Sequence, residues 1–211
     1  MAEQHSVKQG EHLSQIARKY GFRNYLIIWD HANNAALKKL RQDPNILFPG
    51  DSLYIPDRTP KTVPGDTGMT HRFQVYIPKL ELRIALLDYC EQPIQGAACN
   101  LDVEGEVTPL TTDGKGAVRK PIPADSEDGA VRVEALDLDL AIAIGDLDPV
   151  EEDSGVRARL INLAYDAGPK GFDDEGEFRS SVEEFQCDHG LKVTGKVDGA
   201  TRDKLREVYG C

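Results

Sequence analysis

The chain has 211 residues, 40% of them hydrophobic and 7% aromatic, and its formal net charge is −11. This length and composition predict two or three domains with small, mostly aliphatic cores and exclude a disordered chain. The acidic balance argues against binding to nucleic acid or to an anionic membrane surface, and no apolar run is long enough for membrane insertion.

Residues 1–58 predict a module with the order strand, helix, helix, strand. A short extended piece at 6–8 precedes apolar residues at helical spacing. Gly21 then closes the first helix as a C-terminal cap. A second helical pattern runs over 26–40 and stops before Pro44, because a residue that precedes proline disfavours the helical conformation. Residues 52–55 predict the closing strand. The apolar residues of the first helix are Leu13, Ile16, Ala17 and Tyr20.

Two motifs at the ends of this segment resemble the LysM family. They are HSVKQGEHLSQIARKYG at 5–21 and NILFPGDSLYIP at 45–56. The resemblance implies a βααβ LysM module that holds N-acetylglucosamine chains of peptidoglycan, or a chitin-like glycan, between two loops. Glu11–His12 replaces the family's usual Asp–Thr, so a groove that is kept only as a scaffold stays an open alternative. The implied carbohydrate-binding residues are Gly10, Glu11, His12, Leu13, Asn45, Ile46 and Leu47.

Residues 59–70 are rich in Pro, Gly and Thr and predict a linker. From 71 to 150 apolar residues alternate in short runs with Gly, Pro and Asp between them, which predicts a small β-sandwich. The predicted strands fall at 73–77, 80–86, 101–103, 131–133 and 138–144. The segment resembles Ig-like or transthyretin-like β-domains of bacterial surface and secretion proteins, which implies a spacer or docking role. The residues that carry this resemblance are Pro93, Gly96, Ala97, Thr112, Asp113 and Gly116.

Helical spacing returns in residues 151–211 and predicts a three-helix bundle. The three apolar faces are expected at Val156, Leu160, Leu163 and Ala164, at Phe178, Val182 and Phe185, and at Thr201, Leu205 and Val208. The segment resembles the three-helix peptidoglycan-binding domain. Phe185–Gln186, Gly190–Leu191, Gly195, Asp198 and Thr201 match its second half. Gly171–Phe172 stands where that family has Asp–Gly. The fold class is therefore multidomain α+β.

The sequence predicts no enzyme, no metal site and no cofactor. No serine elbow and no His-Glu-x-x-His motif occurs, and the five histidines lack metal-ligand spacing. Cys187 lies two residues from His189, a spacing that does not bring the two side chains together on a helix. Asp173, Asp174, Glu175 and Glu177 form an acidic loop without calcium-ligand spacing. Cys90, Cys99, Cys187 and Cys211 are either free thiols or, after export, pairs, and the sequence does not decide between these.

The predicted function is non-catalytic binding of peptidoglycan that anchors a larger assembly at the bacterial cell wall. The N-terminus lacks the regions of a general secretory signal peptide. We therefore expect synthesis in the cytoplasm and delivery to the periplasm or outside by another route. The layout resembles accessory proteins of type VI secretion or phage-like contractile machines. That resemblance implies the alternative: a docking scaffold for a spike, baseplate or effector protein, without glycan binding.

Overall fold

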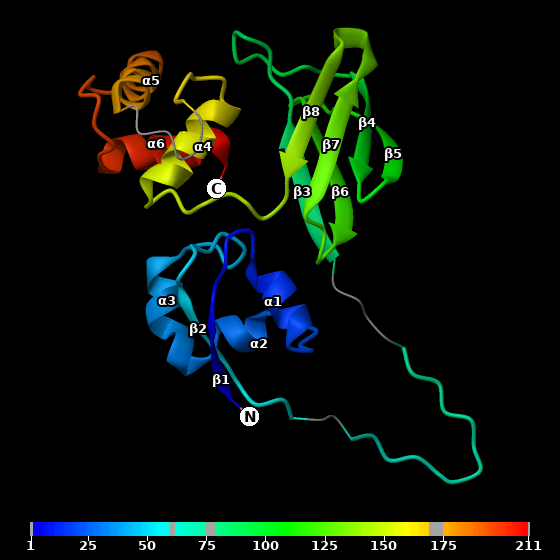
Figure 1. Cartoon of the computed structure of the whole chain (residues 1–211). Coiled ribbons are helices and arrows are strands. Elements are labelled where there is room, and N and C mark those ends of the chain that lie inside the picture. The colour runs from blue at the N-terminus through cyan, green and yellow to red at the C-terminus, as the bar shows by residue number, and fades with distance from the viewer. Residues whose placement is uncertain (1, 60–61, 75–78, 169–174, 211) are drawn as a thin grey trace.

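A computed structural model describes residues 2–59, 62–74, 79–168 and 175–210. The fold is mixed α+β: two small units with sheets are followed by helices at the C-terminal end (Figure 1). Three separate hydrophobic cores follow one another along the chain, at residues 7–55, 86–133 and 150–205. The chain therefore forms three successive modules, which are called here the N-terminal module, the β-domain and the helical module.

The N-terminal module is a two-stranded antiparallel sheet covered by short helices. Strand β1 (Glu3–Ser6) pairs with β2 (Ser52–Ile55), so that His5 faces Leu53. The extended piece expected at 6–8 therefore begins earlier, at residue 3. Helix α1 (Leu13–Lys19) falls where it was predicted. The hydrophobic core of the N-terminal module also contains residues from the second helical region and from β2. The buried members are Val7, Leu13, Ile16, Ala17, Ile28, Trp29, Leu37, Leu47, Leu53 and Ile55.

The single helix expected over 26–40 is broken into three parts: α2 (Leu26–Trp29), the 3₁₀ turn η1 (Ala32–Asn34) and α3 (Ala35–Leu40). His31 is extended and caps η1 by accepting the N–H of Asn33. The buried Asn34 side chain then donates to the carbonyls of Ile28 and Tyr54 and accepts the Tyr54 N–H, each at 2.8 Å. These bonds to a neighbouring strand fix the break, which helical periodicity alone does not reveal.

Residues 62–74, which follow the N-terminal module in the chain, run outward as an extended loop (Figure 1). Its described apolar side chains are exposed, among them Val63 and Met69. A strand was expected at 73–77, but the described residues of this range, 73 and 74, are not in a strand. The side chain of Phe73 is 71% exposed. Val75 and Ile77 lie outside the described residues.

The β-domain consists of two antiparallel sheets around one core. One sheet pairs β3 (Lys79–Ala85) with β6 (Ala117–Pro123). The other has the order β5 (Glu106–Thr111), β4 (Ala98–Val103), β7 (Asp128–Val133), β8 (Leu138–Ala143). A short 3₁₀ turn, η2 (Glu134–Leu136), joins β7 to β8. Strands β5 and β6 were missed because Pro109, Pro121 and Pro123 interrupt their apolar runs. All three prolines lie in strands at a sheet edge, where a missing N–H is tolerated.

The helical module packs α4 (Asp153–Asn162), α5 (Glu175–Asp188) and α6 (Gly199–Tyr209) around one core, as predicted. Ala164 was expected on the first apolar face, but it is exposed, with φ +69°, because α4 ends at Asn162. The Gly171–Phe172 step and the residues Asp173 and Asp174 lie outside the described residues. In the described part of the chain no helix has both the length and the apolar character to cross a bilayer. The buried apolar core is Val150, Val156, Leu160, Tyr165, Ala167, Val182, Phe185 and Leu205.

A buried arginine joins the N-terminal module to the start of the helical module. Arg41 is 3% exposed and forms a two-pronged ion pair with Asp51, with N–O distances of 2.9 and 3.1 Å. Its third contact is with Glu152, at 3.0 Å. Burial opposes the charge of Arg41, but hydrogen bonds to both carboxylates outweigh it and raise the arginine pKa. The first and last modules are therefore in direct contact, through two residues that lie 111 positions apart in sequence.

Candidate functional site

The two loops predicted to hold a glycan lie side by side in the structure. The backbone N–H of Leu13 donates to the carbonyl of Pro44 over 3.3 Å. The side-chain oxygen of Asn45 accepts from both the backbone N–H and the hydroxyl of Ser14, over 3.3 and 2.9 Å. These bonds fix the loop that follows β1 against the loop that precedes β2. The structure thus brings the seven predicted positions together in one place.

Three of the seven predicted residues are buried: His12 is 1%, Leu13 0% and Leu47 5% exposed. Their side chains contribute to the core of the module and to its helix cap, so a ligand cannot reach them in this arrangement. Gly10, Glu11, Asn45 and Ile46 are partly exposed. A ligand at the two loops would therefore meet backbone atoms together with the side chains of Asn45 and Ile46.

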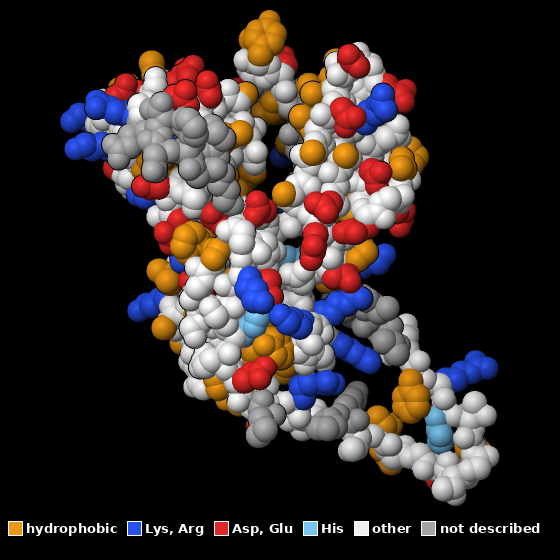
Figure 2. Space-filling model, in the orientation of Figure 1, with side chains coloured by type: hydrophobic (Ala, Val, Ile, Leu, Met, Phe, Trp, Pro, Cys, Tyr) orange, Lys and Arg blue, Asp and Glu red, His pale blue; other side chains and the backbone are white. Residues whose placement is uncertain are grey.

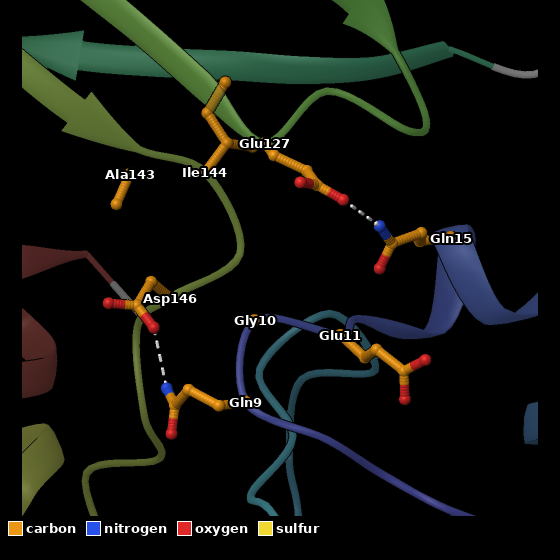
Figure 3. Close-up of a pocket in the computed structure, with 8 residues that line it drawn as sticks. All are labelled: Gln9, Gly10, Glu11, Gln15, Glu127, Ala143, Ile144 and Asp146. Carbon is orange, nitrogen blue, oxygen red and sulfur yellow. Dashed lines mark hydrogen bonds between the residues drawn. The ribbon is translucent and has the colours of Figure 1, made fainter.

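The Glu11 carboxylate is occupied by the protein's own donors. One oxygen lies 2.7 Å from His5 and accepts the backbone N–H of Lys8 at 3.0 Å, and the other lies 3.1 Å from Lys19. Burial alone would raise the pKa of Glu11, but these hydrogen bonds outweigh it and lower the pKa. Glu11 therefore stabilises the loop, and its side chain faces away from the β-domain (Figure 3).

His12 is the N-cap of α1. Its backbone is extended, and its ring nitrogen Nδ1 accepts the backbone N–H of Gln15 at 3.4 Å. Burial lowers the pKa of His12, against an opposing contribution from Asn45. The ring is therefore held in its neutral form. Because Nδ1 accepts a hydrogen bond, the proton of this neutral ring lies on Nε2.

The β-domain packs directly against the loop that follows β1, which no local sequence signal predicts. Gln9 Nε2 donates to Asp146 over 2.7 Å, and Gln15 Nε2 donates to Glu127 over 3.2 Å. A pocket of about 190 Å³ lies between these two bridges, with Gly10 on one side and Ile144 on the other (Figure 3). This pocket adjoins the predicted loops and contains residues of both modules.

The facing surfaces of the N-terminal module and the β-domain carry opposite charges. Acidic side chains gather along the edge of the β-domain that faces the N-terminal module, and basic side chains lie opposite them (Figure 2). Arg18 pairs with Asp125 across the boundary, and both side chains are about half exposed. Exposed ion pairs contribute only about 0–1 kcal/mol each. The charges therefore orient the two modules more than they hold them together.

In the helical module, the buried amide of Gln186 organises the loop between α5 and α6. Its oxygen accepts the N–H groups of Thr194 and Gly195, at 2.7 and 3.1 Å. Its nitrogen donates to the carbonyl of Lys196 and to the hydroxyl of Thr201, at 3.0 and 2.9 Å. Gln186 is 0% exposed. Gln186, which matches the sequence motif of the three-helix domain, therefore stabilises the loop from within the module and is not a surface contact.

A second polar cluster joins the helical module to the β-domain. The hydroxyl of Tyr165 lies 3.1 Å from Asp188, 3.4 Å from Glu91 and 3.5 Å from His189. Burial raises the pKa of Tyr165, and the Asp188 carboxylate raises it further. The tyrosine therefore remains a neutral donor between carboxylates of two modules. His189 also stacks on Phe185, with ring centroids 4.3 Å apart.

The described residues contain no group of three or more His, Cys, Asp or Glu side chains placed to hold a metal ion. Cys90, Cys99 and Cys187 are free thiols, with Cys99 buried and the other two exposed. Burial raises the pKa of Cys99, which keeps its thiol protonated. The possible partner Cys211 lies outside the described residues.

Comparison with known proteins identifies one module. Residues 154–205 match the family model described as "Putative peptidoglycan binding domain". The match spans helices α4 to α6 almost completely and covers roughly a quarter of the chain. A search of curated proteins and a search of solved structures return no match. The helical module is thus a three-helix unit of the peptidoglycan-binding kind, which supports peptidoglycan as a partner of the chain.

Proposed function

We propose that this chain is a non-catalytic binder of peptidoglycan that anchors a larger assembly at the bacterial cell wall. The observation that carries the proposal is the family match over residues 154–205. The adjacent loops of the N-terminal module support it, because they leave backbone groups, an amide and an apolar side chain at one surface. Such a surface suits the hydroxyl, acetamido and methyl groups of N-acetylglucosamine.

Two glycan-binding modules on one chain would act together on a repetitive polymer. Binding through the first module raises the local concentration of the second, so weak individual sites give strong overall attachment. The proposal places the working location of the protein at the wall.

Co-sedimentation of the full chain with purified peptidoglycan sacculi tests this proposal. We expect retention of the wild type and weaker retention of Ile46→Asp, which places a charge at the two loops. Ile27→Asp is the matched control, because Ile27 is 53% exposed on α2 and lies outside those loops. Absence of wild-type retention would contradict glycan binding. Equal retention of wild type and Ile46→Asp would assign the binding to the helical module.

A second candidate function is a protein-docking scaffold in a type VI secretion or phage-like contractile machine. The burial of His12, Leu13 and Leu47 favours it, because these predicted contacts are unavailable to a ligand. The acidic β-domain would then receive a spike, baseplate or effector protein. Cross-linking in cells that produce such a machine distinguishes the two functions. The scaffold requires a link to a machine component and no retention on sacculi.

A further inference from the structure

Strand β8 lies at one edge of the four-stranded sheet of the β-domain and pairs with β7 alone among the described strands. Hydrogen-bonded positions alternate along an antiparallel ladder. The backbone N–H of Ile144 donates to the carbonyl of Glu127 over 2.8 Å, so every second residue back from Ile144 bonds to β7. The residues between them turn their N–H and C=O groups away from β7. These outward-facing residues are Asp139, Ala141 and Ala143.

This row of outward-facing backbone groups is open. Within the described part of the chain, no hydrogen bond joins these groups to a segment other than β7. All three residues are also exposed. β8 is the outermost strand on the side of the helical module in Figure 1, and Figure 2 shows a hollow between that module and the β-domain. A further strand therefore has both unpaired backbone groups and room beside β8.

The other edges of the β-domain sheets are protected against such pairing, and β8 is not. Proteins keep strands of other chains from their sheet edges with charged side chains and prolines. β3 carries exposed charges at alternate residues, and β5 and β6 contain prolines. β8 reads LDLAIA, with one charge and no proline. Its sequence is therefore that of a strand that accepts a partner.

The charges around β8 select the kind of partner. Asp137 directly precedes the strand, Asp139 lies within it and Asp146 follows it. Arg132 of β7 faces Asp139 across the ladder, and no Lys or Arg occurs within residues 133–156. Pairing of β8 with the β8 of a second copy would bring these carboxylates together, and like charges oppose such pairing. Basic residues at the ends of an added strand complement them instead.

We propose that the edge of β8 binds an extended segment of a partner protein, which adds to the sheet as a further strand and has basic residues at both ends. Backbone hydrogen bonds to the outward-facing residues supply the affinity. Alternate apolar side chains of the added strand pack beside Leu140, which is 41% exposed and shares a sheet face with the core-packed Leu138 and Ile142. The inference goes beyond peptidoglycan binding and does not depend on it.

The test uses a synthetic peptide of alternating valine and threonine, as long as β8, with two lysines at each end. Amide hydrogen exchange of the full chain is measured by NMR with and without this peptide. Leu140 and Ile142 are expected to be protected before the peptide is added, because β7 accepts their N–H groups. The peptide should slow exchange at Asp139, Ala141 and Ala143 by at least about tenfold. Binding that leaves these three rates unchanged would overturn the inference.

A variant and a modified peptide separate backbone pairing from attraction by charge. Ala141→Pro removes one outward N–H and leaves the ladder with β7 intact, so we expect the peptide affinity to fall at least about tenfold. Ala141→Val is the matched control, because valine keeps that N–H, and it should bind as the wild type does. A peptide that is N-methylated at its central amides should also bind at least about tenfold more weakly. This last comparison needs no protein variant.

Asp137→Asn tests the charge complementarity. Asparagine tolerates the left-handed backbone of Asp137, with φ +49°, and removes one charge beside the strand. We expect about two- to fivefold weaker binding of the peptide. Glu184→Gln, at an exposed residue of α5, is the control and should leave the affinity unchanged.

Two results with the peptides would contradict strand addition: no binding to the wild type, or equal affinity for the methylated and unmodified peptides. A dimer of the chain that Ala141→Pro dissociates, measured by sedimentation, would assign the edge to a second copy and overturn the basic partner. Sacculi retention should be the same for the wild type and Ala141→Pro. Failure of this inference therefore leaves the peptidoglycan proposal standing, and the reverse also holds.

Discussion

Gly145 of the β-domain packs directly against His12 of the N-terminal module. A Cβ atom at residue 145 would lie 2.9 Å from Cδ2 of His12 and 2.8 Å from the carbonyl oxygen of Gly10. Gly145 also has a φ of +84°, which side chains other than hydrogen rarely adopt. The contact between the modules thus depends on a missing side chain at one position.

Gly145→Ala is therefore expected to move the two modules apart. The control is Gly105→Ala, because Gly105 has a nearly equal φ of +83° but nothing within 4 Å of an added Cβ. Both variants acquire similar backbone strain, and only the first acquires the clash. Small-angle scattering should show a larger radius of gyration for Gly145→Ala alone. Equal radii in both variants would contradict the packing described here.

Protonation of His12 is expected to destabilise the N-terminal module in mild acid. Burial lowers the folded-state pKa of His12 below 6.5, whereas the unfolded chain titrates near about 6.5. The unfolded state then binds more protons, so stability is complete above about pH 6.5 and is lost as the pH falls from there through the folded pKa. The fluorescence of Trp29, the chain's single tryptophan, reports urea unfolding of this module.

His12→Asn provides the control for this pH dependence, because asparagine retains an N-cap acceptor and does not titrate. The loss of stability just below about pH 6.5 should be smaller in the variant than in the wild type. An identical loss in both would show that another group is responsible. Protonation of Glu11 affects stability only at lower pH, since the pKa of Glu11 lies below 4.5.

Removal of Arg41 should strongly destabilise the N-terminal module. Arg41→Met leaves the buried carboxylate of Asp51 without its partner, which costs about 3–5 kcal/mol. Arg18→Met is the matched control, because the exposed pair with Asp125 contributes about 0–1 kcal/mol. Urea unfolding followed by Trp29 fluorescence measures both. A loss below about 1 kcal/mol for Arg41→Met would refute the importance of this pair.

Gln186→Leu is expected to open the loop between α5 and α6. The N–H groups of Thr194 and Gly195 lose their acceptor, at a cost of about 1–3 kcal/mol for each group that stays buried. Amide hydrogen exchange should be faster at these two residues than in the wild type. Gln42→Leu, at an exposed residue, should leave their exchange unchanged. Protection that survives in Gln186→Leu would contradict the bonding described.

Much of the secondary structure follows from local sequence patterns. The apolar spacing of Val156 and Leu160 and of Val182 and Phe185 places α4 and α5 correctly, since these residues form the core of the helical module. The patterns fail where a contact from outside the segment decides the structure. Asn34 breaks the second helical region through bonds to Tyr54, and the prolines of β5 and β6 conceal strands that pairing partners stabilise.

The candidate site was predictable only in part, for the same reason. The motifs place the loops around Leu13 and Asn45 together, because both flank the paired strands. Motifs do not show that His12 is buried, nor that Gln15 meets Glu127, a residue more than a hundred positions further along the chain. A pocket between two domains has no local signature, since each domain contributes only half of its wall.

The most direct test of peptidoglycan recognition maps the binding surface on the isotope-labelled full chain by NMR, with soluble peptidoglycan fragments as the ligand. We predict saturable amide shifts at residues 44–47 and within residues 154–205. Shifts confined to 154–205 would leave only the helical module as a binder. A spectrum that does not change at any fragment concentration would contradict the account.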